Sequence, residues 1–308
     1  MKSLLKEIQN GKILISDGAW GTFLHELGLA VGECPEIWNV THRDKVLSIA
    51  KSYIDAGADM VLTNSFGAHP LRLKHYGLQD RAFELNEAAA AISREAAGKD
   101  HFVLGSIGPS GAIIMMEEIP ETEVYDGFRI QVEALANGGA DAICVETMSE
   151  IAEACLAIRA AKEFTDLEVI CTFTYQKTVH GYYRTMMGVS PEDMIAAVKE
   201  AGADIIGANC GIGFDQMLEV VKEIKEADST TPVLVHANAG IPIVKNNKTI
   251  FPESPEEMSS KVKTLVDAGV NIIGGCCGTT PEHIRLFVQE LRGLSNFSAE
   301  DIYSKKAK

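Results

Sequence analysis

The chain has 308 residues, of which 46% are hydrophobic and only 6% aromatic, and it carries a net charge of −15. This length is ordinary for a (β/α)8 barrel, and the composition predicts an aliphatic core. An acidic chain without a basic cluster argues against nucleic acid or an anionic membrane surface as the main partner. No stretch approaches the roughly 18 apolar residues of a membrane-spanning helix, and we therefore expect no membrane partner and a cytoplasmic location.

Short apolar runs rich in Val and Ile alternate with helix-like segments along the whole chain. We expect strands at residues 13–17, 59–63, 102–107, 141–146, 168–174, 204–209, 232–238 and 271–275. Continuous apolarity is typical of parallel strands that are covered on both faces. The sequence therefore predicts one closed (β/α)8 TIM barrel, with residues 1–308 as a single domain and the active site at the C-terminal ends of the strands.

Four of these strands begin with a similar phrase, in which a glycine precedes Asp or Asn by two residues. The phrases lie at residues 56–59, 138–141, 201–204 and 268–271. A glycine at this position is typical of a helix that ends in a left-handed conformation before the next strand begins. The repetition supports the regular alternation of helix and strand.

Polar and sulfur side chains gather at the predicted strand ends. They are Asp17, Thr63, Asn64, Glu146, Asn209, Cys210, Asn238, Cys276 and Cys277. The C-terminal ends of barrel strands form one rim, so these side chains are expected on one side of the molecule.

The sharpest signal is the cysteine pair Cys276 and Cys277 within the glycine-rich segment 274–278, together with Cys210 at another strand end. Neighbouring residues of a strand point to opposite faces, so the pair can share a metal only if the strand ends before it. The flanking glycines allow that turn. Three thiolates with an open fourth position are typical of a catalytic zinc site, and we favour this interpretation over chance.

The other cysteines have simpler explanations. Cys144, Cys155 and Cys171 lie within apolar runs and are expected in the core, whereas Cys34 is a loop cysteine with no evident partner. An odd total of seven indicates metal binding or reactive thiols in a reducing compartment rather than a disulfide framework.

Three thiolates on Zn²⁺ leave the centre with a net negative charge, which makes it a poor Lewis acid for hydrolysis. Such a centre is well suited to hold a fourth thiol as a thiolate, which is the nucleophilic form of sulfur. The sequence therefore favours alkylation of a thiol substrate over hydrolysis.

The chain resembles the zinc-dependent homocysteine S-methyltransferases, and most closely the homocysteine-binding barrel of cobalamin-dependent methionine synthase. The matching stretches are residues 15–22, 61–67, 105–111, 146–147, 207–210, 238–240 and 274–281. The double cysteine with the upstream Asn-Cys is the specific part of this match, since glycine turns alone would be weak.

This resemblance implies that the chain methylates homocysteine to methionine and that Cys210, Cys276 and Cys277 bind Zn²⁺. It also implies that Asp17 and Glu146 hold the homocysteine ammonium group. Thr63 and Asn64 are expected to contact the substrate as well, and Asn238 is expected to be a displaceable zinc ligand. Two simpler roles stay open, because Asp17 could cap the turn before Gly18 and Asn238 could be a hydrogen-bonding loop residue.

The methyl donor is the least constrained part of the prediction. Methionine synthases carry folate- and cobalamin-binding modules after this barrel, so we expect methylcobalamin or another corrinoid on a separate protein. Alternatives are S-methylmethionine or betaine, whose cationic group Trp20 could bind by its π face, and methyl transfer from another substrate to a corrinoid protein. A non-catalytic zinc-binding subunit is the alternative outside enzymes. Methionines in segments 112–118 and 182–188 fit either a docking surface or buried loop packing.

Overall fold

Eight parallel strands form one sheet in the computed structural model, which describes residues 2–245 and 248–294. Their order in the sheet is β1-β12-β9-β8-β5-β4-β3-β2. The strands are β1 (Leu14–Ile15), β2 (Met60–Leu62), β3 (Phe102–Ile107), β4 (Ala142–Met148), β5 (Glu168–Phe173), β8 (Ile205–Asn209), β9 (Val233–Ala237) and β12 (Ile272–Gly275). All eight predicted strands are present, and the predicted (β/α)8 barrel is confirmed.

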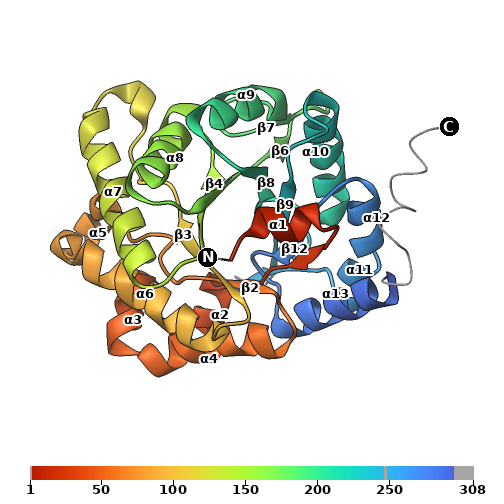
Figure 1. Ribbon diagram of the computed structural model, residues 1–308, viewed down its shortest axis with the longest axis horizontal. Coiled ribbons are helices and arrows are strands. Elements are labelled where there is room, and N and C mark those ends of the chain that lie inside the picture. The colour runs from red at the N-terminus through yellow and green to blue at the C-terminus, as the bar shows by residue number, and fades with distance from the viewer. Residues whose placement is uncertain (1, 246–247, 295–308) are drawn as a thin grey trace.

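Helices surround this sheet on its outer side (Figure 1). Those between the first two strands are α2 (Gly21–Glu26), α3 (Trp38–Thr41) and α4 (Arg43–Asp55). The others that cover the sheet are α5 (Pro70–Leu73), α6 (Ala82–Ala97), α7 (Glu121–Asn137), α8 (Ile151–Phe164), α9 (Pro191–Ala201), α10 (Phe214–Ala227), α11 (Pro255–Ser259), α12 (Val262–Asp267) and α13 (Pro281–Leu294). No helix in the described part of the chain is long and apolar enough to cross a membrane.

The alternation of side chains along each strand separates two apolar cores. One set, which includes Leu104 of β3 and Cys144 of β4, packs inside the barrel. The alternate set, which includes Val103 and Cys171, packs against the surrounding helices. The buried positions of Cys144, Cys155 and Cys171 confirm that these three cysteines belong to the core.

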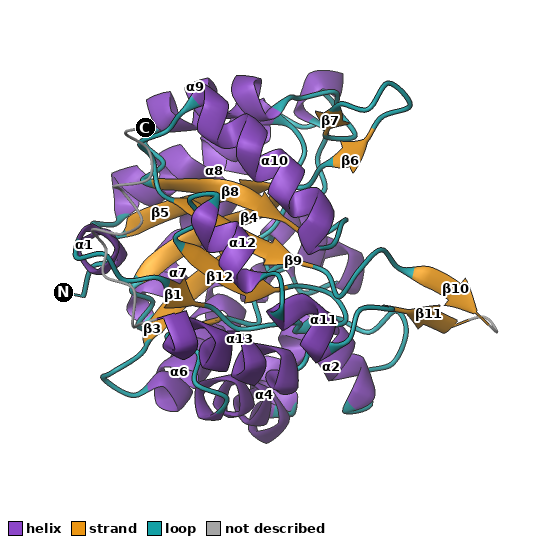
Figure 2. Cartoon of the chain, turned by 90° about the vertical axis from the view of Figure 1, so that its right-hand side faces the viewer, coloured by secondary structure: helices purple, strands orange, loops and turns teal. Residues whose placement is uncertain are grey.

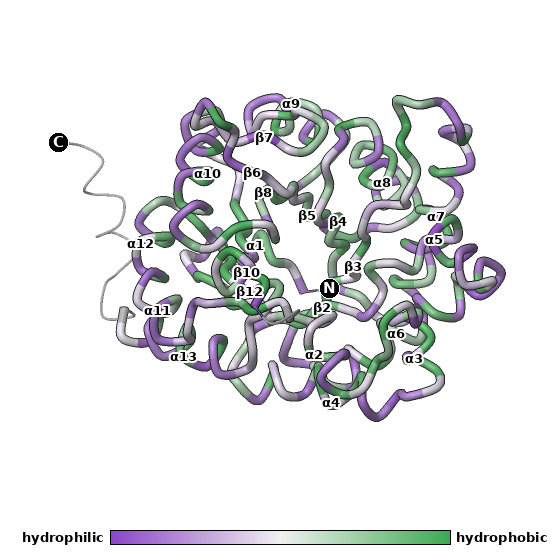
Figure 3. Tube along the Cα trace, turned by 180° about the vertical axis from the view of Figure 1, so that it is seen from behind, coloured by the Kyte–Doolittle hydropathy of each residue, from purple (hydrophilic) through white to green (hydrophobic). Residues whose placement is uncertain are grey.

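Helix α1 (Leu4–Gln9) covers the N-terminal end of the barrel. Leu4 packs with the interior side chains, and its backbone N–H donates to the carboxylate of Glu168 at 2.7 Å. Two hairpins that the sequence did not predict lie at the opposite end (Figure 2). They are β6 (Gln176–Lys177) with β7 (Tyr183–Arg184) and β10 (Ile243–Lys245) with β11 (Lys248–Ile250). Figure 3 looks onto that end, with the strands in the centre and hydrophilic stretches on the surrounding helices.

The Asp or Asn of each repeated phrase joins its strand to the preceding one. Its backbone N–H donates to one residue of the neighbouring strand, and its side chain accepts the N–H of that same residue, at 2.7 to 2.9 Å in every case. We call this arrangement a register clamp. The clamped pairs are Asp59 with Ile15, Asp141 with Val103, Asp204 with Val169 and Asn271 with Val233.

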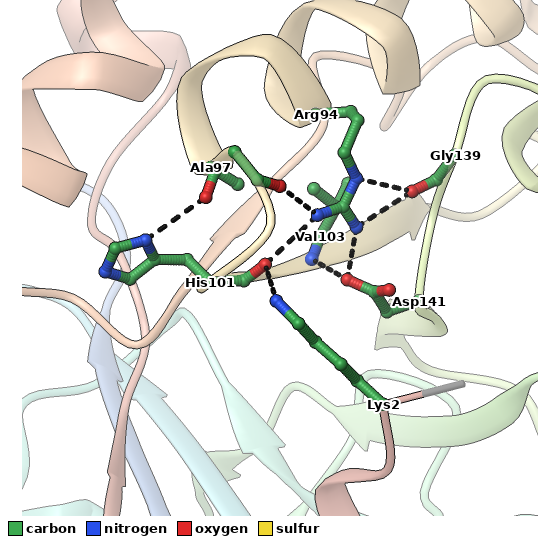
Figure 4. Close-up of polar contacts among 8 residues, drawn as sticks. Lys2, Arg94, Ala97, His101, Val103, Gly139 and Asp141 are labelled. Carbon is green, nitrogen blue, oxygen red and sulfur yellow. Dashed lines mark hydrogen bonds and ion pairs between the residues drawn. The ribbon is translucent and has the colours of Figure 1, made fainter.

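Figure 4 shows the clamp of Asp141. Its carboxylate also pairs with the guanidinium of Arg94, which donates to the carbonyl of Gly139 at 3.0 and 3.1 Å. Lys2 donates to the nearby carbonyl of His101 at 3.0 Å. These contacts fix strand register at the N-terminal end of the barrel, remote from the rim.

The sheet order begins at β1 and ends at β2, and side chains complete the closure between them. Asp59 forms its clamp with Ile15 at one end of this seam. At the other end, Oδ2 of Asp17 accepts the backbone N–H of Leu62 at 2.8 Å. A carboxylate thus takes the place of a carbonyl acceptor between these two strands. The assignment of residues 1–308 to a single domain stays a prediction, because residues 295–308 lie outside the described part.

Candidate active site

The three predicted metal-binding cysteines come together at the C-terminal rim. Cys210 follows β8, Cys276 and Cys277 follow β12, and their three sulfur atoms all lie within 4.8 Å of one another. Among the described residues this is the one group of His, Cys, Asp and Glu side chains with such ligand spacing. The side chains are partly accessible, unlike the core cysteines.

The strand geometry is as the sequence predicted. Strand β12 ends at Gly275, so the two adjacent cysteines lie in the turn that follows rather than on opposite faces of a strand. Gly275 is required there, because a Cβ atom would lie 2.2 Å from Oγ1 of Thr279. That hydroxyl donates to the carbonyl of Cys276 at 2.7 Å and accepts the N–H of Ala19 at 3.1 Å, which ties the cysteine turn to the segment after β1.

Hydrogen bonding from Cys276 and Cys277 lowers the pKa of the Cys210 thiol to about 3. The same contacts, together with burial, raise the pKa of Cys276. One thiolate is therefore stabilised by two neighbouring thiols even in the protein alone. A divalent cation would favour the deprotonated form of all three.

Asn238 adjoins this cysteine group. Its side chain hydrogen-bonds Cys210, and its Oδ1 atom is buried without a hydrogen-bond partner. A buried amide oxygen without a partner is costly in a native protein. An oxygen in this position, beside three sulfur atoms, fits the fourth ligand of a zinc ion. The residues present therefore fit the predicted metal.

A cavity of about 320 Å³ opens beside the cysteines. Its lining includes Thr63, Asn64, Glu146, Cys210, Cys276 and Cys277. Glu146 lies on β4, and its Oε1 atom accepts the hydroxyl hydrogen of Ser106 at 2.5 Å. Burial raises the pKa of Glu146 to about 7. A buried carboxyl group in the same cavity as three thiols suits a ligand that carries both sulfur and a cationic amine.

Asp17 lies beneath this cavity and is not part of its lining. It is fully buried, and its Oδ2 atom accepts the indole N–H of Trp20 as well as the backbone N–H of Leu62, each at 2.8 Å. Burial raises its pKa to about 7. Asp17 thus supports the seam of the barrel and the cavity-lining Trp20, while its contact with a substrate ammonium group stays a prediction.

Thr63 and Asn64 line the cavity, but their side chains already have protein partners. The Thr63 hydroxyl accepts the backbone N–H of Ser106 at 2.9 Å, and Asn64 donates to the carbonyl of Pro35 and to Oδ1 of Asn39, each at 2.9 Å. Both residues shape the wall of the cavity. Their direct contact with a substrate stays a prediction.

Sequence reasoning missed several residues of this site. Ser106 and His236 line the cavity, and the side chain of Asn209 contacts Glu146. His236 is 1% exposed, its Nε2 atom has no hydrogen-bond partner, and burial lowers its pKa to about 3. These three residues occupy inward positions near strand ends, which was the available signal.

The prediction for Cys34 was wrong. Its side chain is buried, and its thiol donates to Oε2 of Glu36 at 3.2 Å. Glu36 also accepts the N–H of Gly67 at 2.7 Å, so the cysteine belongs to a packed connection between two loops. That partner lies only two residues away but becomes available only when the 3₁₀ turn over Pro35–Ile37 forms.

Comparison with known proteins decides the family. The family described as Homocysteine S-methyltransferase matches residues 14–291. The chain belongs to the homocysteine S-methyltransferase family. The predicted family and the prediction of a methyltransferase enzyme are thereby confirmed.

Among curated relatives, the chain is 31% identical to methionine synthase of Mycobacterium leprae over 288 residues, which cover 89% of this chain and 24% of the relative. It is 30% identical to methionine synthase of Mycobacterium tuberculosis over 296 residues, which cover 91% of this chain and 25% of the relative. The chain thus spans about a quarter of the length of these relatives.

Solved structures show the same fold. The metallated form of the homocysteine methyltransferase MmuM from Escherichia coli has a TM-score of 0.76 and 21% sequence identity, with 94% of this chain and 100% of that chain covered. The carboxyl transferase domain of Rhizobium etli pyruvate carboxylase is similar with a TM-score of 0.53 and 15% identity, over 94% of this chain and 49% of that chain.

Proposed function

We propose that this protein transfers a methyl group to the sulfur of homocysteine and so produces methionine. The observation that carries this proposal is the placement of three cysteine sulfur atoms, within 4.8 Å of one another, beside a cavity that also contains the buried carboxyl group of Glu146. Homocysteine carries a thiol and an ammonium group, and the cavity has a matching group for each.

Cys210, Cys276 and Cys277 would hold Zn²⁺, with Asn238 as a ligand that the substrate displaces. Zinc in this position binds the substrate sulfur and keeps it deprotonated at neutral pH. The protein residues supply orientation. Glu146 binds the ammonium group, and Ser106 holds the carboxylate of Glu146 through its hydroxyl group. Trp20 and Leu24 exclude water from the apolar wall.

The donor in this proposal is a methyl-corrinoid carried by a separate protein. Support comes from the rim, where apolar side chains on several loops face solvent. Met115 is 70% exposed, Met186 81%, Val179 97% and Val244 79%. Val179 and Val244 lie in or beside the two hairpins at the cavity end of the barrel (Figure 2). Exposed apolar side chains around a cavity mouth suit a protein partner that delivers the donor.

The test is methionine formation from homocysteine with a panel of donors at matched enzyme and zinc concentrations. The panel is methylcobalamin, a methylated corrinoid protein, S-methylmethionine and betaine. We expect robust transfer with the corrinoids and little with the two small donors. Fast turnover with S-methylmethionine alone would overturn the corrinoid donor and retain the homocysteine acceptor.

The acceptor has its own control. Each donor is also incubated with zinc-loaded enzyme and without homocysteine, and demethylation of a small donor is followed with an unmethylated corrinoid protein present. Methyl transfer to the corrinoid in that mixture, without methionine formation from homocysteine by any donor, would replace the proposed function by the opposite direction of transfer. Zinc binding without turnover in every mixture would indicate a non-catalytic subunit.

A further inference from the structure

The side chain of Asn209 connects the two parts of the cavity that hold different ends of the proposed substrate. Asn209 is the last residue of β8, is fully buried, and directly precedes Cys210. Its Nδ2 group donates to Oε2 of Glu146 at 3.3 Å and to Oγ1 of Thr147 at 2.7 Å. Its Oδ1 atom accepts the N–H of Thr147 at 2.8 Å and the hydroxyl of Thr172 at 2.7 Å.

These four hydrogen bonds use the full capacity of the amide, and the backbone N–H of Thr147 defines which atom is the oxygen. The side chain is therefore held in one orientation. Since consecutive Cα atoms are about 3.8 Å apart, the position of Cys210 is fixed relative to the residues that Asn209 contacts.

Backbone conformation on both sides of this connection is unusual. Thr147 and Cys210 both have φ of +60°, and only one other non-glycine residue in the described part, Glu117, has a positive φ. A β-branched residue rarely adopts this conformation and does so only where its surroundings impose it. Strand β4 also changes register against β5 between Val145 and Met148, which is where Glu146 turns toward the cavity.

We infer that Asn209 is a positioning residue that sets the spacing between the ammonium-binding carboxylate of Glu146 and the sulfur-binding end of the cavity at Cys210. This inference rests on the proposed function and deepens it to substrate selection. In homocysteine three carbon atoms separate sulfur and nitrogen, whereas in cysteine there are two. A fixed spacing selects an amino-acid thiol of one length over shorter amino-acid thiols and over thiols without an amino group.

The experiment measures binding of three thiols to zinc-loaded protein by calorimetry, without any methyl donor. The thiols are homocysteine, cysteine and 4-mercaptobutanoate, which is homocysteine without its amino group. We expect wild-type protein to prefer homocysteine over both. In Asn209→Ala we expect the preference over 4-mercaptobutanoate to fall at least tenfold, with 4-mercaptobutanoate affinity changed less than threefold and zinc content unchanged.

Asn86→Ala is the matched control. Asn86 is equally buried and donates to the carbonyls of Ala68 and Ala82, remote from the cavity. A general loss of stability would affect both variants, whereas only the loss of spacing changes the ratio of affinities. If Asn209→Ala does not fold, the measurement uses Thr147→Gly/Asn209→Ala with Thr147→Gly as its reference, because glycine adopts φ of +60° without strain.

Two failures are distinguishable. If wild-type protein binds homocysteine and 4-mercaptobutanoate equally, recognition of the amino group in the proposed function is wrong. If wild-type protein prefers homocysteine and the Asn209 variant retains that preference within twofold, the inference about Asn209 is overturned while the proposed function stands.

Discussion

The carboxylate of Asp17 accepts the backbone N–H of Leu62 at 2.8 Å and thereby joins β1 to β2, the two strands at which the hydrogen-bonded order of the sheet begins and ends. Because this carboxyl group is fully buried, its pKa is raised from 3.8 to about 7. Asp17 therefore links the closure of the barrel to pH.

A raised pKa means that the folded protein binds a proton more tightly than the unfolded chain. Its contribution to the free energy of unfolding is fully present below pH 3.8 and is lost as pH rises through about 7. In Asp17→Asn the amide oxygen can accept the same two N–H groups without ionising. We expect the variant to gain at least about 1 kcal/mol over wild type between pH 5 and pH 8, since each pKa unit corresponds to about 1.4 kcal/mol.

Urea unfolding at several pH values measures this difference. Asp166→Asn, at an exposed position, is the control and should show no such trend. A constant difference between wild type and Asp17→Asn across the pH range would contradict the role of Asp17 ionisation.

We predict that Glu146→Gln weakens homocysteine binding and leaves zinc content unchanged. Loss of a hydrogen bond to a charged group costs about 1.5–3 kcal/mol, which corresponds to roughly 10- to 150-fold in affinity. Because the pKa of Glu146 is about 7, the carboxylate form increases as pH rises through neutrality. Wild-type affinity should therefore rise more steeply with pH than that of the variant.

The control for this prediction is Glu153→Gln. Glu153 is also buried with a raised pKa and accepts a serine hydroxyl, that of Ser110 at 2.5 Å, but it does not line the cavity. Equal homocysteine affinity in wild type and Glu146→Gln would show that the ammonium group lies elsewhere.

Zinc should bind at about one ion per chain through Cys210, Cys276 and Cys277. Replacement of any one of them by serine removes a thiolate ligand, and we expect zinc content below about a fifth of wild type after dialysis against a weak chelator. Elemental analysis provides the measurement. Cys155→Ser is the control, since that thiol lies near the carbonyl of Ala197, away from the rim. Wild-type zinc content in Cys277→Ser would refute the ligand assignment.

The register clamps provide a prediction about stability. Asn271 shows that an amide can replace the carboxylate in a clamp, so Asp204→Asn should retain the bond to Val169 and lose only the ion pair with Lys162. We expect it to cost less than about 1 kcal/mol, and less still at high salt. Asp204→Ala leaves the N–H of Val169 without its acceptor and should cost about 1–3 kcal/mol.

Thermal unfolding of the two variants at low and high salt checks this prediction. Activity serves as the second readout and should stay near wild type in both, since the clamp lies at the end of the barrel away from the cavity. Equal destabilisation by Asn and Ala would mean that charge, rather than the hydrogen bond, holds the strands.

The sequence predicted most of the fold because apolar runs and glycine punctuation are local signals. Gly57 and Gly202 have φ of +98° and +110°, as expected for helix ends. The residues that follow them by two were predicted only as strand starts. Their role as clamps depends on which strand lies beside them, which is a property of the assembled barrel.

The candidate site divides in the same way. The cysteine group was predictable because a strand that ends in glycines restricts where Cys276 and Cys277 can lie. The left-handed conformation of Thr147 was not, since a β-branched residue ordinarily disfavours it. Only the contacts of Asn209, more than sixty residues further along the chain, make that conformation stable.

The clamps also bear on how this barrel tolerates change. They fix the alignment of four strand pairs from the end covered by α1, so the loops at the other end do not have to set it. Lengthening or exchanging the β10–β11 hairpin, for example, should leave the barrel folded with its cysteine group assembled. A scaffold held from one end in this way lets evolution, or an engineer, replace the surface that meets a methyl donor without rebuilding the pocket beneath it.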